Sequence, residues 1–229
     1  MVNMTVNHPS VADYDLSSLR HLAYGASPMP EAVIMRAMQV MPDVQFYHAY
    51  GQTECAPLTS VNGPESHVFD GPMANMYRSC GRSAPGVMVE IRDENDQEVP
   101  RGEVGEICVR GANVMQGYWK LPELTAETLR GGWLHSGDGG YMDENGYIYV
   151  VDRVKDMIIS GGENISSVEV EGYLYRHPAA AAAAVVAKPD ETWGEVPCAF
   201  VELKPGEDVG TEEFLDWCRG QMAGFTRPK

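Results

Sequence analysis

Long hydrophobic runs are absent from this chain of 229 residues. The longest apolar stretch covers residues 179–187, nine residues between Pro178 and Lys188, whereas a helix needs about 20 to cross a bilayer. The N-terminal residues also lack the basic segment and apolar core of a secretory signal. The sequence therefore predicts neither a transmembrane segment nor a secreted protein, and we expect a cytoplasmic one.

Basic residues are also scarce. Lys and Arg number 17 against 33 Asp and Glu, which gives a formal net charge of −16 at pH 7. Proteins that bind nucleic acid or an anionic membrane surface present a basic face, so the charge excludes both as general partners. An anionic small ligand is compatible with this charge, because it needs only a few local donors.

Cysteine is infrequent, and its spacing is not that of a metal site. The five cysteines contain no Cys-x-x-Cys pair and have no histidine at metal-binding spacing. This pattern favours reduced, mostly buried thiols over a zinc site or a disulfide framework. The cysteines are Cys55, Cys80, Cys108, Cys198 and Cys218.

The composition is that of a globular protein, with 44% hydrophobic and 22% charged residues. Residues 19–24 and 44–49 are each typical of a short buried strand. Between them, apolar side chains at helical spacing predict a helix, for which Ser27 and Pro28 are the expected cap and first-turn residue. This order predicts an α/β strand-helix-strand unit. The apolar helix positions are Ile34, Ala37, Met38 and Met41.

From Gly81 onward the pattern changes to short strands and close turns, which predict a small antiparallel barrel or sheet. Residues 87–91 and 105–111 are expected strands, and residues 121–129 an expected short helix. The Asn145-Gly146 pair between two further strands predicts a hairpin with a type I′ turn.

After Asp156 the sequence predicts an α+β region. Residues 157–159 favour a strand, and Ser166–Glu169 is a capping-box pattern that opens a helix. The alanine-rich residues 179–187 suit a helix by composition and a strand by length and flanking prolines; we interpret them as a strand. A strand over residues 196–203 and a helix over residues 211–222 follow. The expected inward-facing residues of the two helices are Val170, Tyr173, Leu174, Phe214, Trp217 and Cys218.

Two groups of residues suggest a nucleotide site. Thr53 and Glu54 follow the second predicted strand, where a hydroxyl and a carboxylate can contact a phosphate and Mg²⁺. Seen alone, they fit a surface turn with a capping threonine better. Asp138, in a Gly-rich turn, can accept hydrogen bonds from ribose hydroxyls with Arg153 as a partner donor. The alternative is an ordinary turn aspartate and a surface arginine.

Six motifs in order decide between these alternatives. Together they resemble the adenylate-forming (AMP-binding) superfamily of acyl-CoA synthetases, nonribosomal adenylation domains and luciferases. The sequence around residues 161–164 is most similar to the fatty acyl-CoA ligase branch of this superfamily. The resemblance covers the C-terminal portion of the family's proteins. The motifs are YGQTE at 50–54, GEICVRG at 105–111, GYW at 117–119, WLHSGD at 133–138, VDRVKD at 151–156 and SGGENI at 160–165.

The resemblance implies an AMP-forming acid–thiol ligase that activates a carboxylic acid, expected to be fatty, with MgATP and then forms a thioester with coenzyme A. In the larger part of the chain it implies that Asp138, helped by Arg153, binds the ribose and that Thr53 contacts the α-phosphate. Glu54 would help to hold Mg²⁺. The residues implied to line the adenine and acyl side are Gly25, Ala26, Ser27, Tyr50 and Gly51, with Tyr50 against the adenine ring.

The resemblance divides the chain into a partial large domain at 1–152, a hinge at 153–156 centred on Lys155, and an α+β lid at 157–229. Gly161 and Gly162 would line the path of the pantetheine arm. Trp193 would pack on coenzyme A or, as an alternative, in the core. The remaining implied nucleotide contacts are Phe225, Arg227 and Lys229.

Two family features have no counterpart in the sequence. One is an upstream Ser/Thr/Gly-rich phosphate loop with a lysine, and the other is a near-terminal lysine that stabilises charge during adenylation. We therefore expect no ATP–pyrophosphate exchange from these 229 residues. Two alternatives stay open: a non-catalytic module that binds AMP or coenzyme A, and an adenylation domain that serves a carrier protein. The sequence leaves the acid and the oligomeric state open.

Overall fold

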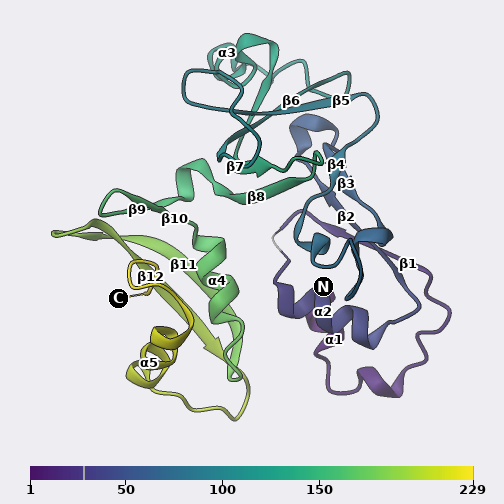
Figure 1. The fold of residues 1–229 in the computed structure, drawn as a ribbon, viewed down its shortest axis with the longest axis vertical. Coiled ribbons are helices and arrows are strands. Elements are labelled where there is room, and N and C mark those ends of the chain that lie inside the picture. Colours follow the sequence, from purple (N-terminus) through teal and green to yellow (C-terminus); the bar gives the residue numbers. More distant parts are fainter. Residues whose placement is uncertain (28, 229) are drawn as a thin grey trace. The chain divides into compact units, whose positions relative to one another are not determined.

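A computed structural model describes residues 1–27 and 29–228 of the chain (Figure 1). The chain forms two compact units, Met1–Val150 and Val151–Lys229. Within the described residues, no helix is long and apolar enough to span a membrane.

The first unit begins with a mixed sheet of order β1-β2-β3-β4. Strands β1 (His21–Gly25) and β2 (Gln45–Tyr50) pair in parallel, with α2 (Glu31–Val40) connecting them, which confirms the predicted strand-helix-strand unit. Strands β3 (Ser60–Asn62) and β4 (Arg82–Ser83) extend the sheet in antiparallel fashion. Helix α1 (Val2–Val6) contacts α2. The buried core here is Val6, Tyr24, Val33, Ile34, Ala37, Met38, Met41, Val44, Phe46 and Tyr77.

The predicted start of α2 was wrong. Pro30 is the N-cap, with no side-chain cap, and its carbonyl accepts the N–H groups of Val33 and Ile34. Ser27 therefore does not cap the helix, and Pro28 lies outside the described residues. The reason is local, because the residue before a proline is disfavoured in the helical region, so Pro30 delays the start of the helix. Strand β1 is also less buried than expected, because Tyr24 is its one buried residue.

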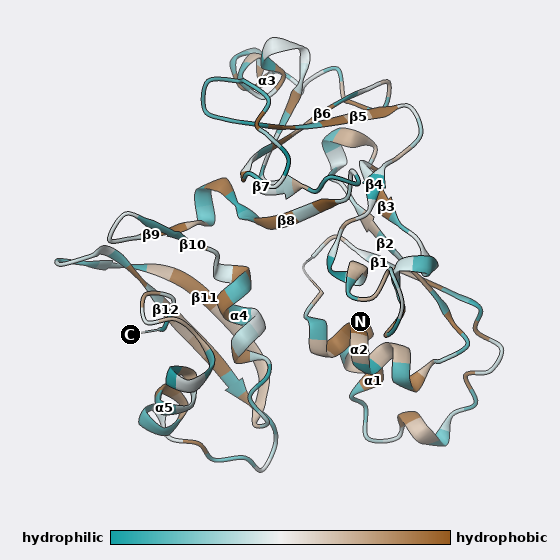
Figure 2. Cartoon of the chain, in the orientation of Figure 1, coloured by the Kyte–Doolittle hydropathy of each residue, from teal (hydrophilic) through white to brown (hydrophobic). Residues whose placement is uncertain are grey.

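The second sheet of this unit has the order β5-β6-β7-β8, and its β5–β6 and β6–β7 pairs are antiparallel, as predicted. Its strands are β5 (Val87–Arg92), β6 (Gly105–Gly111), β7 (Leu134–Met142) and β8 (Ile148–Arg153). The boundary between the two units falls within β8, after Val150. The predicted short helix is α3 (Pro122–Thr128). Hydrophobic colour runs along β6 and β8 (Figure 2). The buried core residues are Cys55, Val89, Ile91, Ile107, Val109, Leu134, Met142 and Ile148.

The β7–β8 hairpin does not use the predicted type I′ turn. That turn needs positive φ at both central residues, and only Gly146 has it, at 80°. Instead, Asp143 Oδ1 accepts the N–H groups of Asn145 at 2.9 Å and Tyr147 at 2.8 Å. The aspartate thus organises a longer turn through its side chain.

The second unit is a four-stranded antiparallel sheet of order β10-β9-β12-β11 with two helices. The alanine-rich segment is a strand, as predicted, because it pairs along its length with β12. Ser166 Oγ caps α4 by accepting the Glu169 N–H at 3.1 Å, as the capping-box pattern predicted. The elements are β9 (Ile158–Ser160), β10 (Glu163–Ile165), α4 (Ser167–Leu174), β11 (Ala180–Asp190), β12 (Gly194–Leu203) and α5 (Thr211–Gln221).

The core of the second unit contains the inward-facing helix residues expected from the sequence. Val170, Leu174, Phe214 and Cys218 are buried, and Tyr173 and Trp217 pack against them half-buried. The other buried members are Ile158, Ile165, Ala180, Val185 and Met222.

The short 3-10 turns of the chain are η1 (Val11–Asp13), η2 (Thr53–Cys55), η3 (Pro64–Ser66), η4 (Met76–Arg78), η5 (Arg130–Gly132) and η6 (Val154–Asp156).

Asp152 anchors the start of the second unit to helix α4. Its carboxylate is buried, and Oδ2 accepts the Ser167 N–H at 2.6 Å and the Ser167 hydroxyl at 2.8 Å. Oδ1 accepts the Arg153 N–H at 2.7 Å. A carboxylate at a helix N-terminus satisfies N–H groups that the helix leaves without partners.

We predict that Asp152→Ala destabilises the second unit by about 2–3 kcal/mol, because it leaves a buried N–H and a buried hydroxyl without their acceptor. Hydrogen exchange of α4 peptides should accelerate accordingly. The matched control is Asp156→Ala, which removes an exposed carboxylate from η6. Equal exchange rates in the two variants would contradict the anchoring role.

Candidate nucleotide-binding site

The parallel pairing of β1 and β2 brings the predicted adenine-side residues to one edge of the sheet. Gly25 lies opposite Ala49, Ala26 and Ser27 follow β1, and Tyr50 ends β2. A Cβ built on Gly25 would lie 2.1 Å from the Ala49 carbonyl oxygen. A side chain at this position would therefore force the two strands apart at their carboxyl ends, where ligands gather in open α/β sheets.

Glu54 is held by a contact that the sequence did not reveal. It lies in η2, which follows β2 after Gly51 and Gln52, and the Tyr118 hydroxyl donates to its Oε1 at 2.7 Å. The Met115 N–H donates to the Glu54 carbonyl at 2.8 Å. The pKa of Tyr118 is raised, chiefly because its hydroxyl donates to Glu54, so it remains a donor. The GYW motif contains Tyr118 and could have marked it as a site residue. Its contact with Glu54, however, is visible only in the folded structure.

Asp138 lies in a strand bulge, which corrects the predicted Gly-rich turn. In the β6–β7 ladder, His135 pairs with Cys108 and Gly139 pairs with Glu106. Residues 136–138 therefore face a single β6 residue, Ile107, and the extra length forms a bulge. Gly137 supplies the positive φ of 74° that the bulge uses.

Tyr50 orients the Asp138 carboxylate. Its hydroxyl donates to Asp138 Oδ2 at 2.8 Å, and Asp138, which is 8% exposed, also donates its N–H to Ser136 Oγ at 3.0 Å. Burial, and then the charge of Asp138, raise the pKa of Tyr50 far above its usual value, so its proton is retained. The structure thus joins the end of β2 to the bulge of β7 through two predicted site residues.

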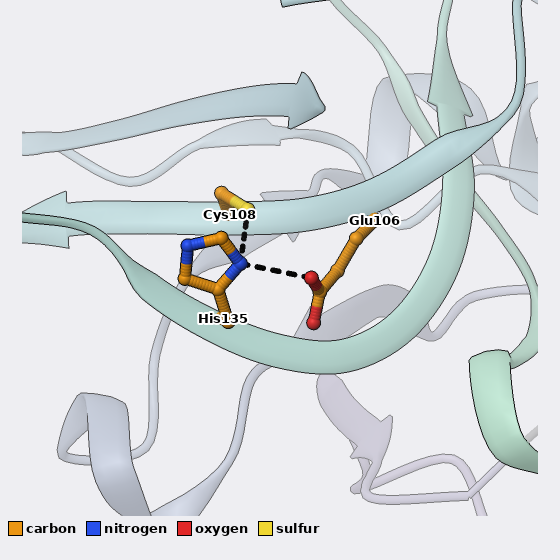
Figure 3. Close-up of side chains that lie close together, drawn as sticks. All are labelled: Glu106, Cys108 and His135. Atoms are coloured by element: carbon orange, nitrogen blue, oxygen red, sulfur yellow. Dashed lines mark hydrogen bonds and ion pairs between the residues drawn. The ribbon is translucent and has the colours of Figure 1, made fainter. Parts of the chain in front are cut away.

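Glu106 supports this bulge and was missed by the sequence interpretation. Its Oε1 accepts the Gly137 N–H at 2.9 Å, and its Oε2 lies 2.8 Å from His135 Nδ1 (Figure 3). Arg130 Nη2 lies 3.3 Å from the same Oε2. No motif marks a glutamate as the partner of a bulge 31 residues away, so only the strand pairing reveals it.

Cys108 has a histidine neighbour in the structure that the sequence spacing did not indicate. Its Sγ lies 3.4 Å from His135 Nδ1. These residues are 27 positions apart in sequence but directly paired across β6 and β7. The prediction of reduced, mostly buried thiols holds, because all five cysteines are free and four of them are buried.

The predicted ribose partner and the predicted hinge residue both lie in the second unit. Arg153 ends β8 and is exposed, and its carbonyl accepts the Met157 N–H at 3.1 Å. Lys155 is exposed in η6. Asp138 belongs to the first unit, so its pairing with Arg153 stays a prediction.

Gly161, Gly162 and Trp193 come together in the second unit. The two glycines form the loop between β9 and β10, with φ of 61° and 88°, and Ser160 pairs with Glu163 on either side. The Gly161 N–H donates to the Trp193 carbonyl at 2.8 Å. A Cβ on Gly161 would lie 2.8 Å from Trp193 Cε3. Trp193 is 49% exposed, so it is not a core-packing residue.

We predict that Gly161→Ala destabilises the second unit more than Gly162→Ala does. Both substitutions place a side chain at positive φ, at a cost of about 1–2 kcal/mol. Only the Gly161 Cβ also meets the Trp193 ring, since nothing lies within 4 Å of a Cβ on Gly162. Urea unfolding should separate the variants by about 1 kcal/mol or more. Equal destabilisation would show that the Trp193 contact is not tight.

The predicted C-terminal contacts lie after α5. Phe225 is 50% exposed, and Arg227 Nε donates to the Ala223 carbonyl at 3.4 Å. Lys229 lies outside the described residues. Their roles toward a nucleotide stay predictions.

Two models of known families match the chain. A model of the AMP-binding enzyme family matches residues 1–119, and a model of the AMP-binding enzyme C-terminal domain matches residues 169–229. The chain belongs to the AMP-binding enzyme family. Its members are adenylate-forming ligases, as the six motifs indicated.

Two relatives of this family show different acyl acceptors. The chain is 45% identical over 222 residues to a feruloyl-CoA synthase from Amycolatopsis sp, covering 97% of the chain and 44% of the relative. It is 39% identical over 228 residues to the fatty acid–[acyl-carrier-protein] ligase ScoC from Streptomyces coeruleorubidus, covering 100% and 43%. The chain therefore spans less than half the length of these relatives.

A solved structure supports the fold assignment. The o-succinylbenzoate coenzyme A synthetase MenE from Bacillus subtilis, in complex with ATP and magnesium ion, superposes with a TM-score of 0.82 at 31% identity. The match covers 99% of the chain and 44% of MenE. The fold is thus that of the family's C-terminal portion.

Proposed function

We propose that this chain contributes the ribose and α-phosphate side of the ATP site, and the lid, to an AMP-forming acid–thiol ligase. The ligase would activate a carboxylic acid, fatty or related, and pass the acyl group to coenzyme A. The observation that carries the proposal is the buried Asp138 carboxylate, oriented by Tyr50 at the edge where β1 and β2 end.

The reaction has two steps in this proposal. The carboxylate of the acid attacks the α-phosphorus of ATP, which gives an acyl-adenylate and pyrophosphate. The thiol of coenzyme A then attacks the acyl carbon, and AMP leaves. Asp138 and Arg153 bind the ribose, and Thr53 contacts the α-phosphate. The Gly25 edge and Tyr50 face the adenine.

The surroundings of Glu54 fit a magnesium ion. Mg²⁺ is commonly held by one or two carboxylates together with substrate phosphates and water. Glu54 offers one carboxylate beside Thr53, and Tyr118 fixes its orientation through Oε1. When bound, the ion would neutralise phosphate charge.

The lid would consist of residues 157–229 and turn at the hinge 153–156 around Lys155. Gly161 and Gly162 would then face the pantetheine arm, and Trp193, half-exposed beside Gly161, would contact coenzyme A. Phe225, Arg227 and Lys229 would contact the nucleotide.

A carrier protein is the second candidate acceptor, because the ScoC relative is named as an acyl-carrier-protein ligase. A thioester-forming assay with coenzyme A and with a holo-carrier protein in parallel, using the enzyme that contains this chain, distinguishes the two acceptors. Product with coenzyme A alone supports the proposal.

The site itself is tested by calorimetry of the chain with a non-hydrolysable acyl-adenylate analogue. We expect saturable binding at one site per chain. A folded chain that binds no analogue would overturn the proposal that the nucleotide site is formed here.

A further inference from the structure

Three potential metal ligands converge beside the bulge of β7. Cys108 and Glu106 come from β6 and His135 from β7 (Figure 3). One ligand atom of each residue lies within 4.8 Å of the others. His135 Nδ1 is the central atom, 3.4 Å from Cys108 Sγ and 2.8 Å from Glu106 Oε2.

We propose that Glu106, Cys108 and His135 form a binding site for a zinc-like divalent ion, which links β6 to β7. Thiolate, imidazole and carboxylate are the three protein ligands that Zn²⁺ takes, and a water completes a tetrahedron in sites with three of them. No role in the proposed acyl transfer is required of this ion.

The spacing of Cys108 Sγ and His135 Nδ1 is close to that of a formed site. Tetrahedral bonds of about 2.3 Å to sulfur and about 2.0 Å to nitrogen place these two atoms about 3.5 Å apart, and Sγ and Nδ1 are 3.4 Å apart. The nitrogen and carboxylate oxygen must separate by about half an ångström from 2.8 Å to reach tetrahedral spacing. Cys108 Sγ and Glu106 Oε2 lie within 4.8 Å of each other, so the Glu106 side chain must also turn toward the sulfur to reach a tetrahedral spacing of about 3.5 Å.

Asp96 supplies the expected outer support. A metal-bound histidine usually donates its second ring N–H to a carboxylate, and His135 Nε2 lies 3.6 Å from Asp96 Oδ1. Arg130 Nε lies 3.2 Å from the same oxygen. Glu106 can bind the ion through Oε2 while Oε1 keeps the Gly137 N–H, so the bulge that carries Asp138 is preserved.

The surroundings of Cys108 exclude the rival role of a nucleophile. Its exposed fraction is 0%. A fully buried thiol is out of reach of an electrophile in solvent. Metal binding breaks the S–H bond, forms a sulfur–metal bond and releases one proton to solvent, with no electron transfer.

The test uses the purified chain in a non-thiol reductant after treatment with a chelator. We expect one equivalent of Co²⁺ to produce a thiolate-to-cobalt charge-transfer band, and Zn²⁺ to displace it. Cys108→Ser should abolish the band and weaken Zn²⁺ binding by more than about tenfold. Cys198→Ser, which removes a thiol from the second unit, should leave both unchanged.

A second variant protects the test against misfolding of Cys108→Ser. Asp96 is 37% exposed at the side chain and has φ of 58°, which asparagine tolerates. Asp96→Asn should keep the charge-transfer band and weaken Zn²⁺ binding about tenfold. The proposal is overturned if the wild-type chain gives no band, if the band persists in Cys108→Ser, or if folded Asp96→Asn binds Zn²⁺ with wild-type affinity.

Discussion

Asp138→Ala is expected to abolish measurable binding of an acyl-adenylate analogue. In the proposed site the Asp138 carboxylate accepts both ribose hydroxyls, and each hydrogen bond to a charged group contributes about 1.5–3 kcal/mol. Their loss corresponds to roughly 100-fold or more in Kd. Calorimetry with the wild-type chain and the variant measures this directly.

Two further variants show whether the loss belongs to the ribose contact. Asp70→Ala removes an exposed carboxylate from the same unit and should leave the analogue's Kd unchanged. Tyr50→Phe keeps the ring but removes the hydroxyl that orients Asp138, so we expect a weakening of about fivefold, near 1 kcal/mol. If folded Asp138→Ala binds as tightly as the wild type, Asp138 is not the ribose ligand.

Glu106→Ala is expected to damage both stability and nucleotide binding, although Glu106 touches no proposed ligand in that site. It removes the acceptor of the Gly137 N–H and the partner of His135. The Gly137 N–H is partly buried, and a donor left without its acceptor costs up to about 1–3 kcal/mol. A loss near 2 kcal/mol lowers the Tm of a unit of this size by roughly 4–8 °C. The relaxed bulge should also weaken analogue binding about tenfold, because Asp138 loses its fixed position.

The matched control for this variant is Glu103→Ala. Glu103 is an exposed glutamate just before β6, so its removal changes the charge equally without touching the bulge. We expect its Tm and analogue Kd to match the wild type. A metal-free Glu106→Ala chain with unchanged Tm would contradict the supporting role of Glu106. Unchanged Kd with lowered Tm would restrict that role to stability.

Local patterns predicted several elements correctly. The apolar spacing of Ile34, Ala37 and Met38 placed α2, because a helix must turn its apolar face to the core. The cap of α4 was visible because Ser166 and the Glu169 N–H interact within one turn. The alanine-rich strand β11 was harder to predict from composition, since alanine favours a helix; its pairing with β12 outweighs that preference.

Other local predictions failed where two short-range preferences compete. Ser27 is a good capping residue, but Pro30 sets the start of α2 three positions later. Asn145-Gly146 suits a type I′ turn, but the Asp143 side chain binds the following N–H groups and selects a different turn. In each case the interaction that determines the structure, at Pro30 or at Asp143, is itself local. The residue types alone do not show that it is stronger than the cap or turn that was predicted.

The motifs of the sequence were enough to identify the family and to name Asp138, Tyr50 and Glu54 as candidate site residues. Their mutual contacts required the tertiary structure. The Tyr50–Asp138 contact joins residues 88 positions apart, and Tyr118 meets Glu54 across 64. The register of β6 against β7 likewise creates both the bulge under Asp138 and the Glu106–Cys108–His135 cluster. The type of each side chain can be read from the sequence. The register of a strand, by contrast, arises from the burial and hydrogen bonding of the whole strand, and this register determines which side chains become neighbours.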